Sequence, residues 1–127
     1  MKIKYLCTLW GMNKPTLEDN LKVIKDAGFE GIEMIVPEDS AVRNRLGVLL
    51  NEIGLDLVAQ VRAEGSTADV QIESLEKGLG EAAELNPLFV NAHCGKDFWH
   101  FKEKRRVIVS AQRFARERGV KVLHETH

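Results

Sequence analysis

Residues 31–61 read GIEMIVPEDSAVRNRLGVLLNEIGLDLVAQV and contain one complete strand–helix–strand unit. The unit begins with a short apolar run, Gly31–Val36, and ends with another, Leu55–Val61, each of the length of a buried strand. Between them, apolar residues recur at the spacing of one helix face: Val42, Leu46, Leu49, Leu50 and Ile53. We expect Ser40 to cap this helix and Gly54 to end it.

The same alternation extends in both directions along the chain. Three more apolar runs are expected to be strands, at Tyr5–Trp10, Leu88–Ala92 and Val120–Glu125. Three more helices are expected, one capped by Thr16 and the others at Ala68–Leu85 and Phe101–Arg118. Alternating strands and helices are typical of a parallel sheet with helices packed on it. The sequence therefore predicts an α/β fold of five strands and four helices.

The 127 residues have the length of a single domain, residues 1–127, with a composition typical of folded proteins: 44% hydrophobic and 29% charged. Eighteen Lys and Arg against 19 Asp and Glu give a net charge of −1, so we expect no nucleic acid partner. No apolar run approaches the roughly 20 residues of a membrane helix, so we expect neither a membrane span nor a signal peptide. Two cysteines make no disulfide framework, which favours a cytoplasmic location.

Polar and apolar side chains alternate along the expected strands, which places the two kinds on opposite faces of the sheet. If the apolar side chains face the helices, five polar residues share the other face: Glu33, Gln60, Asn91, His93 and Glu125. Polar groups removed from water need partners or a bound metal. Carboxylate together with imidazole suits a borderline divalent cation such as Zn²⁺ or Mn²⁺.

All four histidines lie at or just beyond the ends of the last two expected strands: His93, His100, His124 and His127. In parallel α/β folds, ligands bind at the carboxyl ends of the strands. Neighbouring strands are therefore expected to bring these histidines together at that end, with His124 turned toward a helix and His100 toward solvent.

Several of these side chains also have simpler interpretations. A salt bridge to Arg62 explains Glu33 as well as a catalytic role does, and a hydrogen bond to a backbone carbonyl would explain His93. Cys94 is either a nucleophile or an inert buried thiol, because nothing in the sequence places a base beside it. Trp10 either lines a pocket or covers the end of the sheet.

Three segments resemble the xylose-isomerase-like TIM barrels, the sugar phosphate isomerase/epimerase superfamily. They are GIEMIV at 31–36, FVNAHCGKD at 89–97 and VKVLHETH at 120–127, and the resemblance follows the chain in order. It implies the amino-terminal half of a barrel, a partial (βα)4β barrel, with a divalent metal (Mn, Zn or Mg) at its carboxyl end. An open flavodoxin-like sheet fits five strands equally well, but segment 10–16, WGMNKPT, lacks the loop it needs.

The resemblance also implies a reaction and the residues that perform it. Family members isomerise or epimerise sugars or sugar phosphates by moving a proton next to a carbonyl. Glu125 matches the first metal-binding glutamate and, with Glu33, is a candidate catalytic residue, while His93 matches a histidine that binds substrate or metal. The further candidates for substrate binding are His127, Trp10 and Gln60.

A complete barrel of this kind needs about 250 residues. We therefore expect the 127-residue chain alone to bind metal weakly or not at all, and to self-associate so that the open sheet edges are covered. One alternative is a non-catalytic half-barrel fragment or self-assembling module. A lesser one is a metal hydrolase related to apurinic endonucleases, which would need histidine ligands on early strands, where this chain has Gln60.

Overall fold

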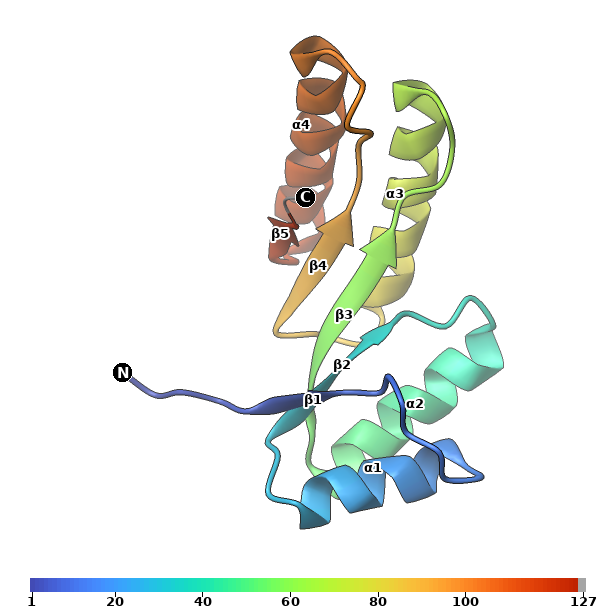
Figure 1. Cartoon of the computed structure of the whole chain (residues 1–127), viewed down its shortest axis with the longest axis vertical. Helices are drawn as coiled ribbons and strands as arrows, with labels where there is room; N and C mark the ends of the chain where they lie inside the picture. Colours follow the sequence, from blue (N-terminus) through green and yellow to red (C-terminus); the bar gives the residue numbers. More distant parts are fainter. Residues whose placement is uncertain (126–127) are drawn as a thin grey trace.

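The computed structural model describes residues 1–125, and within them five strands alternate with four helices (Figure 1). The strands are β1 (Leu6–Thr8), β2 (Gly31–Ile35), β3 (Asp56–Arg62), β4 (Phe89–His93) and β5 (Val122–His124). The helices are α1 (Leu17–Asp26), α2 (Ser40–Ile53), α3 (Ala68–Ala83) and α4 (Phe101–Arg118). No helix in this part of the chain is long and apolar enough to cross a membrane. The predicted α/β class is confirmed.

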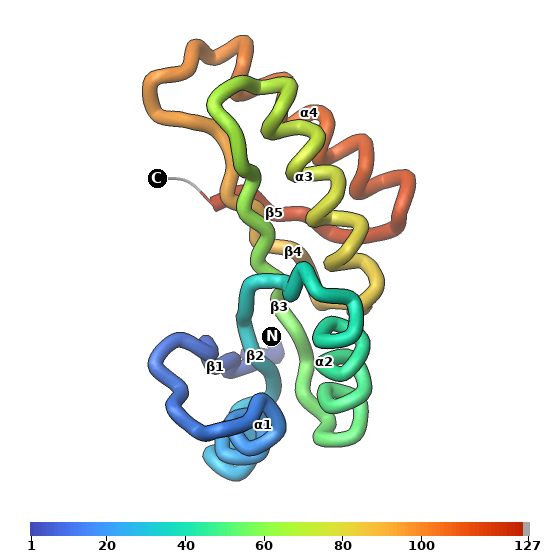
Figure 2. Tube along the Cα trace, turned by 90° about the vertical axis from the view of Figure 1, so that its right-hand side faces the viewer, coloured from blue at the N-terminus to red at the C-terminus, as the bar shows by residue number. Residues whose placement is uncertain are grey.

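The strands form a single parallel sheet in the order β1-β2-β3-β4-β5. A flavodoxin-like sheet has the order 2-1-3-4-5, so that alternative is wrong. Strands in chain order, with α2, α3 and α4 along one side of them (Figure 2), form the wall of a β/α barrel. The predicted partial barrel is confirmed as an open (βα)4β sheet.

Some predicted boundaries need correction. The outermost strands, β1 and β5, are only three residues long, because each pairs with a neighbour on one side. Ser40 is the first residue of α2 rather than its cap: the Asp39 carboxylate accepts from the Val42 backbone N–H at 2.9 Å. Thr16 caps α1 as predicted, accepting from the Asp19 N–H at 3.0 Å.

The hydrophobic core lies between the sheet and the helices. Strand residues that face the helices are almost completely buried: Ile32, Leu57, Ala59, Val61, Val90 and Ala92. Helix residues packed in the same core include Leu21, Leu46, Leu49, Leu75, Leu79 and Val107. The predicted alternation is therefore confirmed, and the polar residues between these positions lie on the opposite face of the sheet.

Gly78 lets α3 lie close against β3. A Cβ atom at this position would be 2.5 Å from Cγ1 of Val61, a distance that real side chains do not adopt. Glycine normally weakens a helix, yet α3 is continuous because Leu75 and Leu79 anchor it in the core. The glycine therefore serves the packing of helix on strand.

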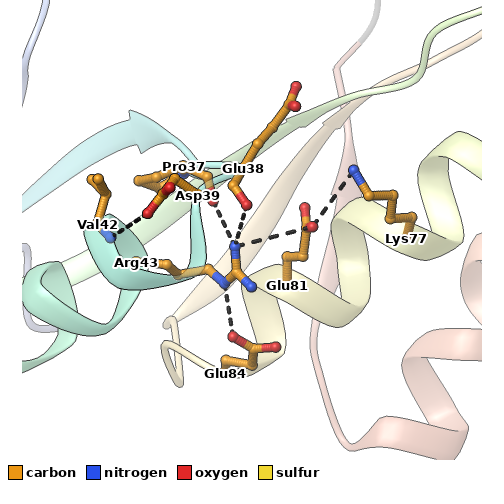
Figure 3. Close-up of polar contacts among 8 residues, drawn as sticks. All are labelled: Pro37, Glu38, Asp39, Val42, Arg43, Lys77, Glu81 and Glu84. Carbon is orange, nitrogen blue, oxygen red and sulfur yellow. Dashed lines mark hydrogen bonds and ion pairs between the residues drawn. The ribbon is translucent and has the colours of Figure 1, made fainter.

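Arg43 joins α2 to the loop after β2 and to the end of α3 (Figure 3). Its Nη1 donates to the backbone carbonyls of Pro37 and Glu38, at 2.8 and 2.9 Å. Its Nε donates to the Glu84 carboxylate at 2.7 Å, and Glu81 lies 4.0 Å from Nη1. This buried side chain thus fixes the loop at the carboxyl end of β2, beside the candidate site.

Candidate functional site

Polar side chains from consecutive strands form a hydrogen-bonded row on the sheet face away from the helices. We call Glu33 of β2, Gln60 of β3, Asn91 of β4 and Glu125, just after β5, the polar row. The Gln60 and Asn91 amides donate to the same Glu33 oxygen, at 2.9 and 3.3 Å. Asn91 Nδ2 also donates to Glu125 Oε2 at 3.1 Å. One amide nitrogen therefore joins two carboxylates.

His93 stands at the carboxyl end of the same face. Its Nε2 lies 2.8 Å from Glu125 Oε2, and the two side chains are 17% and 40% exposed. The backbone N–H of Glu125 donates to the Ala92 carbonyl at 3.1 Å, which continues the strand pairing beyond β5. The structure thus brings together four of the residues selected from the sequence: Glu33, Gln60, His93 and Glu125.

Gln60 has a buried oxygen that no hydrogen-bond donor of residues 1–125 reaches. The residue is 9% exposed, and its NH₂ group must face Glu33, because a carboxylate oxygen accepts hydrogen bonds. The amide oxygen Oε1 then faces away from Glu33, and no group of residues 1–125 donates to it. A buried acceptor left unpaired is destabilising, so this position favours a ligand that brings a donor such as a hydroxyl.

Arg62 does not form the salt bridge to Glu33 that the sequence left open. Its Cζ lies 5.8 Å from the centroid of the Trp10 ring, a cation–π arrangement, whereas Glu33 is held by amides. The Trp10 side chain is 66% exposed. Trp10 and Arg62 therefore form a rim beside the polar row instead of a cover over the sheet.

Known structures with the same fold place this geometry in context. No family model and no curated protein matches the sequence. A 3-keto-D-glucoside 4-epimerase from E. coli matches with a TM-score of 0.73 and 15% identity. The chain has the fold of about half of a TIM barrel. A sugar phosphate isomerase/epimerase from Parabacteroides distasonis matches with a TM-score of 0.74 and 13% identity. These matches cover 97% and 98% of this chain but 56% and 55% of those chains, so the chain spans about half their length.

The polar row lies on the sheet face that forms the interior of a complete TIM barrel. The sheet face opposite the helices is the barrel interior, and the active site lies at the carboxyl ends of the strands. Arg62 and His93 are the last residues of β3 and β4, while Trp10 and Glu125 lie just beyond β1 and β5. These four residues therefore lie at the carboxyl end of the sheet, and the other members of the polar row, Glu33, Gln60 and Asn91, lie within the strands on the interior face.

The metal site implied by the resemblance does not fit the described residues by themselves. Glu125 and His93 lie in direct contact, 2.8 Å apart, and supply one carboxylate and one imidazole. Catalytic zinc sites normally use three protein ligands. Residues 1–125 contain no group of three or more His, Cys, Asp or Glu side chains that could hold a metal ion. The metal-ligand roles of Glu125 and His93 therefore stay predictions.

Cys94 lies on the helix side of the sheet, with its sulfur 3.4 Å from Nδ1 of His124. Gln112 Nε2 is 3.3 Å from the Val122 carbonyl and 3.4 Å from His124 Nε2. Because a carbonyl only accepts, this NH₂ group donates to both, and the ring proton of His124 sits on Nδ1. In that tautomer His124 cannot take the thiol proton, and burial raises the pKa of Cys94. The geometry favours the inert-thiol interpretation.

Burial of His124 predicts a specific pH dependence of stability. Desolvation lowers the pKa of His124 below the ordinary value of 6.5, so below that pH the unfolded chain binds a proton that the folded chain does not. The contribution of neutral His124 to the free energy of unfolding is therefore present above pH 6.5 and is lost as the pH falls toward the pKa of His124 in the folded state. We expect chemical denaturation to show that His124→Gln flattens this loss, whereas His100→Gln, at an exposed position, leaves it unchanged. Equal profiles for the wild type and His124→Gln would contradict the assignment.

The three histidines among residues 1–125 do not form one cluster, contrary to expectation, although His124 and His100 point as predicted, toward a helix and toward solvent. His93 faces the barrel interior, His124 faces α4, and His100 is exposed at the start of α4, where its N–H donates to Glu103. His124 is in register with Ala92, the residue before His93, and successive residues of a strand point to opposite faces of the sheet. His93 and His124 therefore lie on opposite sides of the sheet. His127, a predicted substrate-binding residue, lies outside the described residues.

Sequence reasoning missed the roles of two residues. Asn91 is predicted on the inner face but is not among the predicted site residues, although it bridges both carboxylates. Its position on β4, the strand next to β5, just after which Glu125 lies, could have indicated this. For Arg62 the sequence predicts a place on the inner face and offers a salt bridge to Glu33, but no signal in the sequence connects it with Trp10.

Proposed function

We propose that the polar row binds the hydroxyl groups of a sugar, as part of a sugar isomerase or epimerase. The observation that carries the proposal is the pair of carboxylates, Glu33 and Glu125, joined by the amide of Asn91. Neighbouring strands are about 4.8 Å apart, so side chains in such a row can reach several hydroxyls of one sugar. Two of the solved structures with this fold are named as a 3-keto-D-glucoside 4-epimerase and a sugar phosphate isomerase/epimerase, which supports this substrate class.

In the proposed reaction, Glu33 and Glu125 exchange a proton with the carbon next to the sugar carbonyl. A general base must come within about 2.6–3.2 Å of the atom whose proton it takes, and both carboxylates face the barrel interior. Gln60 and His93 hold hydroxyls, and the exposed ring of Trp10 contacts the apolar face of the sugar. None of these roles depends on a metal. Metal dependence, like the role of His127, stays a prediction.

A ligand titration tests the proposal on the chain as it is. With ¹⁵N-labelled protein and D-fructose, we expect amide signals at the carboxyl ends of β2, β3 and β4 to shift. Glu33→Gln and Glu125→Gln are each expected to weaken binding about tenfold, because each removes a charged acceptor. Glu73→Gln, at an exposed position of α3, is the matched control and should bind like the wild type. Shifts confined to other parts of the protein, or unaffected by both site variants, would disprove the proposal.

The structure also offers an observation in favour of self-association. β1 and β5 each have one neighbour in the sheet, and Ile35 and Leu123 are each 43% exposed. Open edges and apolar side chains on a sheet are protected in most proteins by another chain or element. A self-assembling half-barrel is therefore the second candidate, and light scattering under the titration conditions gives the mass of the species that binds sugar.

A further inference from the structure

Arg62 extends the polar row toward the rim of the half-barrel. It lies two residues after Gln60 on the same face of β3, and in register with His93 on β4. Its guanidinium reaches Trp10, which follows β1, although β2 stands between β1 and β3 in the sheet. Arg62 and Trp10 therefore span the carboxyl end of β2, the strand that carries Glu33.

Arg62 forms no ion pair with a carboxylate of residues 1–125, which is also true of Arg105, Arg116 and Arg118. Four arginines on the helices do pair with carboxylates: Arg43, Arg45, Arg106 and Arg113. A guanidinium can stack on an aromatic ring while its fork of N–H donors stays available in the plane of the group. Trp10 thus orients a cation whose donors are not used by a carboxylate of the described chain.

The buried oxygen of Gln60 provides an independent second point. It lacks a donor among residues 1–125 and lies on the interior face, below Arg62. Two residues along a strand span about 6–7 Å. A ligand that satisfies both groups must present a hydroxyl at one position and a hydrogen-bond acceptor, preferably charged, about two to three carbon atoms away.

We infer that Arg62 binds an anionic group, a phosphate or a carboxylate, on a sugar whose hydroxyl donates to Gln60. The inference rests on the proposed function, because the polar row must hold the sugar. Arginine matches the paired oxygens of either anion through two parallel N–H···O bonds. The substrate class is therefore an acidic or phosphorylated polyol, and Arg62 is the residue that selects it.

Nearby carboxylates restrict how the anion is bound. Three carboxylates and two cations line a cavity of about 330 Å³: Glu38, Glu64, Glu81, Arg62 and Lys77. The net negative charge of this lining opposes a free anion, whereas a sugar anchored by its hydroxyls brings the anion to Arg62 at high effective concentration. Inorganic phosphate should consequently bind much more weakly than a sugar phosphate.

Binding measurements with matched ligands test the inference. D-Fructose, D-fructose 6-phosphate, D-gluconate and inorganic phosphate are titrated into wild-type, Arg62→Gln and Arg105→Gln proteins. We expect at least one charged sugar to bind the wild type about tenfold more tightly than D-fructose. Arg62→Gln should remove this advantage and leave D-fructose binding unchanged. Arg105→Gln removes an exposed arginine of α4 and should keep the wild-type ratio.

Each outcome is decisive. Preference for the phosphate or for the carboxylate identifies which anion Arg62 selects. If D-fructose binds at the polar row but Arg62→Gln keeps the full advantage of the charged sugars, this inference is overturned and the proposed function stands. Inorganic phosphate binding as tightly as the sugar phosphate would also overturn it. If no sugar binds, whatever its charge, the proposed function fails and this inference fails with it.

Discussion

Asn91→Asp is expected to lower the free energy of unfolding by about 2–4 kcal/mol at neutral pH. The substitution replaces an amide that donates to Glu33 and Glu125, at 3.3 and 3.1 Å, with a third carboxylate at nearly the same position. Three carboxylates in hydrogen-bond contact cannot all be ionised without strong repulsion. The group therefore retains protons in the folded state and titrates as a unit with raised pKa values.

The pH dependence of the free energy of unfolding distinguishes this effect from an ordinary loss of packing. Between about pH 4 and 7 the folded variant binds more protons than the unfolded chain, so its stability falls as the pH rises. Urea denaturation from pH 4 to 7.5 should show Asn91→Asp near wild-type stability at the acid end and the full deficit at neutral pH. Asn44→Asp, at an exposed position of α2, is the control and should lose little stability across this range. A pH-independent deficit would contradict the bridging role of Asn91.

Gly78→Ala is expected to destabilise the protein by about 1–2 kcal/mol. Its Cβ would lie 2.5 Å from Cγ1 of Val61, which is buried between β3 and α3. Overpacking of this kind costs about 1–3 kcal/mol, which exceeds the gain of at most about 1 kcal/mol from replacing glycine inside a helix. Urea denaturation at pH 7 measures the difference.

Gly80→Ala is the matched control in the same helix. Its Cβ would lie 3.8 Å from Cζ of Phe114, an ordinary van der Waals distance. Without a clash, the helix propensity of alanine should raise stability by up to about 1 kcal/mol. If the two variants changed stability in the same direction, the close approach of α3 to β3 would not be the reason for Gly78.

Most of the fold could be predicted from local patterns. The apolar stripe from Val42 to Ile53 became α2, and the alternation along 31–36 and 55–61 placed Ile32, Leu57 and Val61 under the helices. These patterns have periods of 3.6 and 2 residues, which a sequence displays directly. The Ser40 cap was wrong because Asp39, one residue earlier, offers an equally suitable oxygen.

The candidate site could be predicted as a face of the sheet, but not as a set of contacts. Alternation alone assigned Glu33, Gln60 and Glu125 to the interior. It could not show that Asn91 would donate to two carboxylates, or that the Gln60 oxygen would be left without a donor in the described residues. Such contacts depend on strand register to within one residue, and a sequence does not display register.

The sequence by itself determined which residues face the helices and which face the interior, because that choice follows from local periodicity. Only the tertiary structure decided the strand order and the partners of Arg62, Cys94 and His124. Order and partners depend on how β1 to β5 are arranged side by side, and residues far apart in the chain meet there. Glu33 accepts a hydrogen bond from Asn91 instead of pairing with Arg62, and both candidates are far from Glu33 in the sequence. The register of β2, β3 and β4 determines which of them lies within reach of Glu33.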